Sequence, residues 1–276
     1  MQPSEIRTLF FSPTGTTRRV ADAIAQAAAD GSPVVATDLT HAKAPALTFG
    51  PDTVALLAAP VYGGHIPPLA FKRLAEVRGN GTPAIIAVVY GNRDFGKAAV
   101  ELAEFARRHG FRPIAAAAFV GEHSYNSPAA PIAAGRPDAD DMAVATAFGA
   151  NIRAKLRAEQ PATVDAARLK TPRTPLLSLL RFIRFVLAYR RWQRKNPVVR
   201  IPVGDAARCT RCGRCAALCP TQAIARGDEL HTDPQRCIRC CACVKGCPTG
   251  ARSYETPFAD ALARNFSRRK PPVTLL

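Results

Sequence analysis

Two stretches of clustered cysteines constrain this chain more than any other feature of its sequence. "RCTRCGRCAALCPTQ" at 208–222 and "RCIRCCACVKGCPTG" at 236–250 share the spacing C-x2-C-x2-C-x3-C-P, and their arginines and Pro-Thr pairs align as well. The region is therefore an internal duplication. The alignment leaves out one of the nine cysteines, Cys241, because Gly213 occupies its place in the first run.

This spacing is typical of iron–sulfur cluster binding. Three thiolates separated by two residues each wrap one cluster, and the fourth, just before the proline, ligates the other cluster of the pair. The first cluster is predicted to use Cys209, Cys212, Cys215 and Cys247. The second cluster is predicted to use Cys219, Cys237, Cys240 and Cys243. Cys241 is interpreted as a small residue inside the ligand loop.

Two other uses of the cysteines fit the sequence less well. A structural zinc site needs only four ligands in paired hooks, so two copies of a triple spacing ending in Cys-Pro argue against zinc. A disulfide framework disagrees with the clustered C-x2-C spacing, and residues 1–11 lack the apolar stretch of a secretory signal. We therefore expect the chain in a reducing cytoplasm.

The N-terminal half alternates apolar strands with helices. Strands are predicted from Ile6 onward and at 34–37, 54–59, 84–90 and 115–120. Helices are predicted after Gly15 and at 69–77, 97–109 and 140–158. Continuous apolar runs indicate parallel strands buried on both faces. The pattern predicts a doubly wound, five-stranded parallel α/β sheet, with ligands at the carboxyl ends of its strands.

The loop after the first strand has the chemistry of an anion site. Four hydroxyl residues surround Gly15 where an alanine-rich helix begins: Ser12, Thr14, Thr16 and Thr17. The N–H groups at a helix N-terminus attract an anion, and the hydroxyls add further donors. The sequence has no G-x-x-x-x-G-K-[ST] motif, so this is not a Walker loop. Phosphate binding is the hypothesis, and an ordinary helix cap is the alternative.

On this [ST]-x-T-G-x-T pattern, matched by Ser12, Thr14, Gly15 and Thr17, the N-terminal half resembles a flavodoxin. The whole chain resembles flavodoxin–ferredoxin fusion proteins. The resemblance implies a C-terminal α+β bacterial-type ferredoxin domain with two [4Fe-4S] clusters, and FMN with its phosphate in the first loop. It implies that the flavin ring contacts two further loops, at Pro60, Val61, Tyr62, Gly63 and Gly64 and at Tyr90, Gly91, Asn92, Arg93 and Asp94.

Two residues after the last parallel strand are candidates for proton transfer. His123 and Tyr125 begin a long loop that runs to Pro137, and their position would let them line a flavin pocket. Long loops without secondary structure are often lids. A purely structural role for both side chains is the alternative.

Four segments are expected along the chain. Residues 1–160 form the FMN-binding domain, 161–204 a basic helical connector, 205–255 the ferredoxin domain and 256–276 a tail. The connector has ten Arg or Lys residues and no acid between Ala166 and Gly204, and residues 175–196 have a helical period. This segment is too short and too charged to cross a bilayer. It is expected to pack between domains or to lie on an anionic membrane surface.

Together these features predict an iron–sulfur flavoprotein oxidoreductase that moves electrons between a low-potential donor, two [4Fe-4S] clusters and FMN, which reduces a small substrate or cofactor. The alternative is a carrier between redox proteins without a substrate of its own. The cofactors would lower the formal charge of +17 to about +11, which suits an acidic partner or membrane. No nucleic-acid-binding motif and no G-x-G-x-x-G after a strand is found, so neither nucleic acid nor NADH is expected.

Overall fold

The computed structural model describes residues 2–276, which divide into two compact units. The first contains the residues up to Glu122, Gly135–Pro172 and Lys270–Leu276, and the second contains His123–Ala134 and Arg173–Arg269. This division differs from the four consecutive segments expected from the sequence. The loop at 123–134 joins the second unit, and the end of the tail joins the first, because packing between distant segments decides both.

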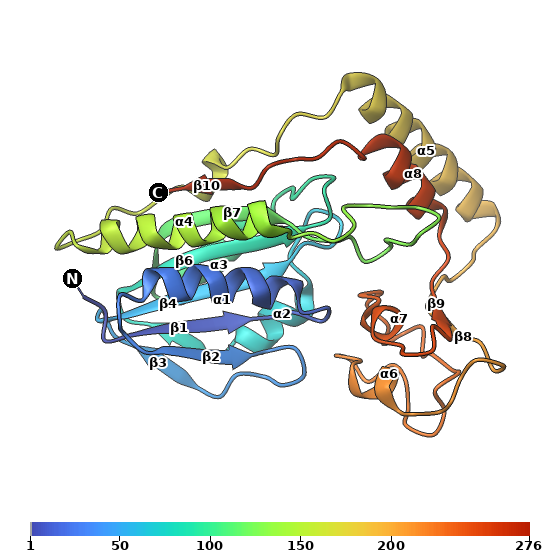
Figure 1. Cartoon of the computed structure of the whole chain (residues 1–276), viewed down its shortest axis with the longest axis horizontal. Coiled ribbons are helices and arrows are strands. Elements are labelled where there is room, and N and C mark those ends of the chain that lie inside the picture. Colours follow the sequence, from blue (N-terminus) through green and yellow to red (C-terminus); the bar gives the residue numbers. More distant parts are fainter. Residues whose placement is uncertain (1) are drawn as a thin grey trace. The chain divides into compact units, whose positions relative to one another are not determined.

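A six-stranded sheet forms the centre of the first unit (Figure 1), in the order β10-β7-β6-β4-β1-β2. Its strands are β1 (Glu5–Phe10), β2 (Val34–Asp38), β4 (Thr53–Pro60), β6 (Thr82–Tyr90), β7 (Phe111–Val120) and β10 (Val273–Leu275). All but β10 are parallel. Counted along the chain, the parallel strands have the order 2-1-3-4-5, which is the flavodoxin-like order. The predicted doubly wound fold is confirmed.

The sixth strand and a second small sheet were not predicted. β10 pairs antiparallel with β7, and just before it the Lys270 N–H donates to the Asn92 side-chain oxygen at 3.3 Å. β3 (Leu47–Phe49) and β5 (Val77–Gly79) form a two-stranded parallel sheet. Strands of three residues are too short to show a periodicity, so only their tertiary pairing reveals them.

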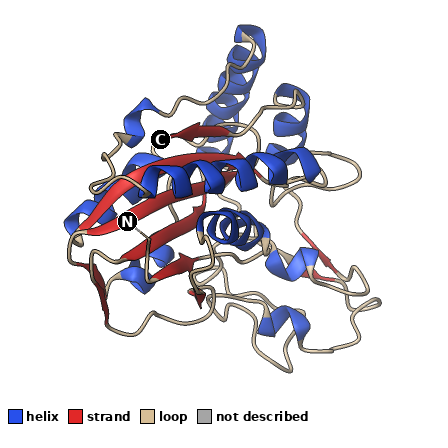
Figure 2. Cartoon of the chain, turned by 60° about the vertical axis from the view of Figure 1, so that its left-hand side comes forward, coloured by secondary structure: helices blue, strands red, loops and turns tan. Residues whose placement is uncertain are grey.

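Helices lie on both sides of the main sheet (Figure 2). They are α1 (Thr16–Ala28), α2 (Pro68–Leu74), α3 (Ala98–Arg108) and α4 (Ala139–Leu156). α1 and α4 pack together on one face, where Ile24, Phe148 and Ile152 share a core with Phe10 and Phe119 of the strands. Side-chain alternation sends other residues to the opposite face, where α3 contacts β6 and β7.

Close approach of α1 and α4 requires Gly149. A Cβ at this position would lie 2.4 Å from the Ile24 carbonyl oxygen and 2.7 Å from the Ala27 Cβ. The helix pair therefore fixes α1, and with it the first loop, against the sheet.

The second unit combines two packed helices with the cysteine runs. The predicted helix over 175–196 is confirmed as α5 (Leu176–Lys195), which packs against α8 (Pro257–Asn265). The remaining elements are β8 (Val203–Gly204), α6 (Arg214–Ala217), α7 (Ala242–Lys245) and β9 (Arg252–Ser253), with β8 antiparallel to β9. Within residues 2–276, every helix falls short of the combined length and apolarity needed to span a membrane.

Candidate functional site

The two cysteine runs share one backbone conformation. Residues at equivalent places adopt left-handed φ angles: 51° and 56° at Arg211 and Arg239, 72° and 58° at Gly213 and Cys241, and 53° and 62° at Gln222 and Gly250. Each run also begins with the same turn. The Cys209 N–H donates to the Asp205 carbonyl at 3.0 Å, and the Cys237 N–H donates to the Asp233 carbonyl at 3.1 Å. The sequence duplication is thus a duplication of structure.

Cys241 occupies a backbone position that favours glycine. It is the N-cap of α7 with a φ of 58°, as Gly213 is the N-cap of α6 with a φ of 72°. A side chain at such a φ costs about 1 kcal/mol. The Cys241 side chain is 1% exposed, and its Sγ lies 3.6 Å from the Arg239 carbonyl oxygen.

A small cavity brings together five cysteines from the two runs. It is lined by Cys219 of the first run, by Cys237, Cys240 and Cys243 of the second, and by Cys241. Burial raises the pKa of Cys240 to about 12 and that of Cys243 to about 11, and the nearby Cys219 adds to both shifts. Both thiols, of Cys240 and Cys243, therefore keep their protons until a metal replaces them. Without Cys241, these cysteines are the set predicted for the second cluster.

A single metal ion and a cubane cluster need different arrangements of their cysteine ligands. Among residues 2–276, no three His, Cys, Asp or Glu side chains converge closely enough to hold one ion. Zinc requires its sulfur ligands about 2.3 Å from a common centre. A cubane cluster spreads its four thiolates over four iron atoms, so its ligands stand farther apart.

Sequence reasoning missed Arg252, which lies beside this cavity. Its side chain is 3% exposed, and its guanidinium donates to the carbonyl oxygens of Glu229 at 2.7 Å and Pro202 at 3.0 Å. It also hydrogen-bonds Cys243 and thereby opposes the burial that raises the pKa of this thiol. The sequence does contain a sign of this role, because Arg252 aligns with the apolar Ile224 and is thus a charged residue at an apolar position of the repeat.

The other predicted ligand set is partly open to solvent. Its members are Cys209, Cys212, Cys215 and Cys247, of which Cys215 is buried and Cys212 is exposed. An open groove next to Cys212 is lined by Arg214, Arg226 and Arg236. The first run thus reaches the surface beside a concentration of positive charge.

The first loop of the sheet has the geometry of an anion cradle. Gly15 is the N-cap of α1 with a φ of 79°, and it has no side chain to accept hydrogen bonds from the first turn. The Arg18 N–H donates to the Ser12 hydroxyl at 3.0 Å, which holds the loop in shape. The hydroxyl oxygens of Thr14 and Thr16 lie 3.4 Å apart, and a Cβ on Gly15 would meet no atom within 4 Å. Open space therefore adjoins the helix N-terminus.

The second and third loops are held together by glycines. Tyr62 and His65 exchange backbone hydrogen bonds around Gly63 and Gly64, whose φ angles of 64° and 95° suit a tight two-residue turn. A Cβ on Gly96 would lie 2.6 Å from the Gly64 carbonyl oxygen, so the close contact of the two loops depends on glycine. Tyr62 is partly exposed.

In the third loop, Tyr90 and Asn92 are buried and Asp94 is exposed. Tyr90 is 2% exposed and packs edge-on against Phe95 at 5.4 Å, and burial raises its pKa. Asn92 is 2% exposed, and Asp94 accepts hydrogen bonds from the Gly96 N–H and the Thr171 hydroxyl, both at 2.7 Å. The expected contact of this loop with a flavin stays a prediction.

His123 and Tyr125 have partners within the second unit. The Tyr125 N–H donates to His123 Nδ1 at 3.0 Å, and the two rings meet edge to face at 4.7 Å. Tyr125 also packs against Tyr254 at 5.0 Å and hydrogen-bonds it, and burial followed by the Tyr254 phenol raises the pKa of Tyr125. These contacts give both side chains a packing role.

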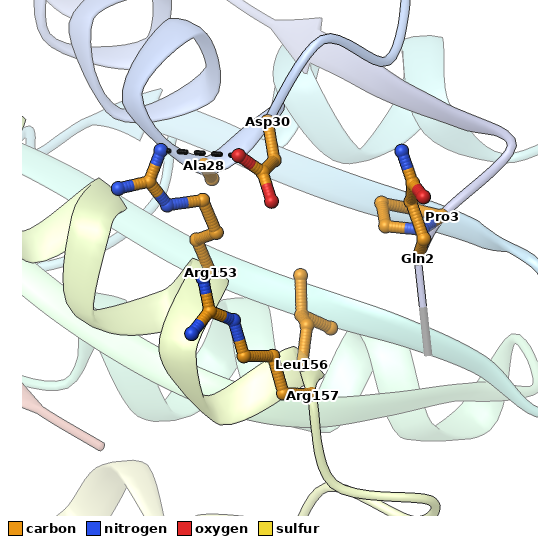
Figure 3. A pocket seen from close by; sticks show the side chains of 7 residues that line it. All are labelled: Gln2, Pro3, Ala28, Asp30, Arg153, Leu156 and Arg157. Carbon is orange, nitrogen blue, oxygen red and sulfur yellow. Dashed lines mark hydrogen bonds and ion pairs between the residues drawn. The ribbon is translucent and has the colours of Figure 1, made fainter.

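A pocket of the first unit lies at the opposite end of the strands (Figure 3). Gln2 and Pro3 precede β1, and the rest of its lining comes from the C-terminal ends of α1 and α4, where Arg153 bonds Asp30 at 3.3 Å. Ligands of doubly wound sheets bind at the carboxyl ends, so this pocket is not a candidate cofactor site.

Comparison with known families identifies the cysteine-rich segment. A family model described as "4Fe-4S dicluster domain" matches residues 201–248. The C-terminal region is a 4Fe-4S dicluster domain. Its eight aligned cysteines support two [4Fe-4S] clusters. With its flavodoxin-like sheet and this dicluster domain, the chain is an electron-transfer protein.

Solved structures with related folds include two flavodoxins. One from the domain Archaea is 16% identical over 56% of this chain and 99% of its own, with a TM-score of 0.40. Flavodoxin 1 from Bacillus cereus is 18% identical over 54% of this chain and 97% of its own, with a TM-score of 0.39. A flavodiiron core from Synechocystis is 17% identical over 56% of this chain and 36% of its own, with a TM-score of 0.41. At such values the strand order, and not these matches, establishes the fold. No curated protein matches the sequence.

Proposed function

We propose that the first unit binds FMN at the carboxyl ends of β1, β4 and β6, and that the chain is an iron–sulfur flavoprotein oxidoreductase. The first loop carries this proposal, because Gly15 has no side chain to cap the first N–H groups of α1, and open space and hydroxyl groups lie beside them. Such a terminus favours a phosphate. Bound clusters would carry single electrons, and FMN would exchange single electrons for pairs.

Each loop has a distinct task in this proposal. The hydroxyls of Thr14 and Thr16 and the first N–H groups of α1 hold the phosphate. The Gly63–Gly64 turn lets the backbone approach a planar ring, and the partly exposed Tyr62 offers an aromatic face.

The groove beside Cys212 is the proposed docking surface for an acidic redox protein. Arg214, Arg226 and Arg236 line it, and the chain carries a formal charge of +17. Opposite charges speed the encounter of two proteins. Electrons would enter or leave the dicluster domain here, next to its exposed cysteine.

The FMN site is tested by removing two hydroxyls of the first loop. The double variant Thr14→Val/Thr16→Val should weaken FMN binding about tenfold or more for each hydroxyl lost, because each contacts a charged group. Riboflavin, which lacks the phosphate, should bind the variant and the parent equally. Fluorescence titration measures both affinities, with Thr48→Val, an exposed threonine of β3, as the matched control. Equal losses for FMN and riboflavin would contradict the phosphate assignment.

An anaerobic reductive titration of the holoprotein, followed by visible absorption and EPR, tests the redox assignment. We expect about four electrons per chain, one for each cluster and two for the flavin. Reduction of the flavin in a single two-electron step would favour reduction of a small substrate. Reduction in two separated steps would favour the second candidate, a carrier between redox proteins, which the packing roles of His123 and Tyr125 also favour. Uptake of only two electrons would overturn the proposal of a bound flavin.

A further inference from the structure

Helix α5 has two apolar faces, one packed against α8 and the other exposed. On the first face, Phe182 meets Phe266 at 5.0 Å, and both Phe185 and Tyr189 meet Phe258 at 5.2 Å. Phe182 is 7% exposed. This face holds α5 against α8, which lies beside it (Figure 1).

The second face is an exposed stripe formed by Leu176, Leu180, Ile183 and Leu187. Steps of four, three and four residues bring these side chains within about 60° of one another around the helix. Their exposed fractions are 70, 49, 43 and 61%. Seven of the twelve exposed large hydrophobic side chains among residues 2–276 belong to α5, so the exposure is concentrated on this helix. Such a concentration marks an interaction surface.

Positive charges flank the stripe, and the surrounding chain has no negative ones. At 100° per residue, Arg184, Arg191 and Lys195 follow one edge of the stripe, and Arg190 lies at the other edge. All four are exposed. Between Ala166 and Gly204 the sequence contains ten Arg or Lys and no Asp or Glu. A protein partner would have to supply a matching acidic rim around an apolar groove, whereas an anionic bilayer offers both chemistries everywhere.

We propose that α5 binds in the plane of an anionic membrane surface, with this stripe inserted at the boundary between headgroups and acyl chains. The flanking arginines and lysine contact lipid phosphates while their aliphatic stems lie along the apolar layer. The face packed on α8 points away from the stripe, so binding requires no unfolding of the second unit. The helix is not apolar enough to cross the bilayer, which agrees with an in-plane orientation.

Vesicle cosedimentation of the full-length holoprotein tests this proposal. We expect binding to vesicles of equal parts phosphatidylglycerol and phosphatidylcholine, little binding to pure phosphatidylcholine, and weaker binding as salt is added. Arg184→Gln/Arg191→Gln should weaken binding roughly fivefold for each cation removed. Leu180→Ser/Ile183→Ser should weaken it at least roughly tenfold, because each side chain loses its insertion into the apolar layer.

Matched controls remove the same kinds of side chain at positions outside α5. Arg108→Gln/Arg157→Gln takes away two exposed cations, and Val144→Ser/Leu276→Ser takes away two exposed apolar side chains, so both should bind like the parent. A reporter variant, Leu187→Trp/Trp192→Phe, moves the only tryptophan of the chain onto the stripe, and its emission should shift to the blue on anionic vesicles. Absence of binding to anionic vesicles would overturn the proposal. A second result would also overturn it: the parent protein forms a dimer in sedimentation, Leu180→Ser/Ile183→Ser dissociates this dimer, and neither binds vesicles. The stripe would then bind a second copy of the chain.

Discussion

Cys219 belongs to the first cysteine run by sequence and to the second by contact. It lines the same cavity as Cys240 and Cys243, and it contributes to the raised pKa of both thiols. The reason is the turn that follows it, where the Gln222 N–H donates to the Cys219 carbonyl at 3.2 Å and Gln222 adopts a left-handed φ. One residue thereby ties the two halves of the domain together.

Paired cysteine variants test this exchange of ligands. Cys219→Ala/Cys243→Ala should lose one of the two [4Fe-4S] EPR signals and about half of the iron, because both ligands serve one cluster. Cys219→Ala/Cys215→Ala should lose both signals, although its two cysteines lie in one run. The reversed pattern would show that each run holds its own cluster. Cys241→Gly, at the glycine-like position, should keep the full iron content and serves as the control.

Among the secondary-structure elements, α4 shows how a helix N-terminus joins distant parts of the first unit. Asp138 and Asp141 form a capping box, and Asp141, which is fully buried, also forms an ion pair with Arg136. Arg136 donates in turn to the Lys270 carbonyl oxygen at 2.9 Å, just before β10. A single buried pair thus connects the start of α4 with the edge strand at the end of the chain.

Breaking this pair should destabilise the first unit strongly. Asp141→Ala leaves the Arg136 cation buried without its partner, which typically costs about 3–5 kcal/mol. Replacing both residues, in Arg136→Met/Asp141→Leu, should recover much of this loss because no unpaired charge remains. Denaturant unfolding measures the free energy of each variant. Asp140→Ala, an exposed acid of the same turn, should cost less than about 1 kcal/mol. An Asp141→Ala cost as small as that of the control would contradict the role of the pair.

For the molecule as a whole, the main sheet and the dicluster region differ in what holds them together. The main sheet has a large apolar core on both faces. The dicluster region has a small one, in which Cys215, Ile224 and Cys243 are the buried members. Two of these three are predicted cluster ligands. A region with so few apolar contacts depends on its metal for stability.

Removing the clusters should therefore unfold one region and not the other. After anaerobic chelation of iron, amide hydrogen exchange should become fast across residues 205–253 and stay slow in β4 and β6. Readdition of iron and sulfide should restore protection. If the β4 and β6 amides lost protection together with the dicluster region, the two regions would form one cooperative unit. If neither changed, the apolar contacts alone would hold the dicluster region.

Local patterns were enough for much of this protein. The cysteine spacing predicted the dicluster domain, and the alternation of apolar runs predicted all five parallel strands, because both depend on residues close together in the chain. The positions of Arg252, β10 and the loop at 123–134 required the tertiary structure. The position of Arg252 is determined by its hydrogen bonds to the carbonyl groups of Pro202 and Glu229. That of β10 is determined by its pairing with the open edge of β7. That of the loop is determined by the packing of Ile132 with Phe182 and Phe266. Each depends on partners tens of residues away or more, and such contacts leave no periodicity in the segment itself.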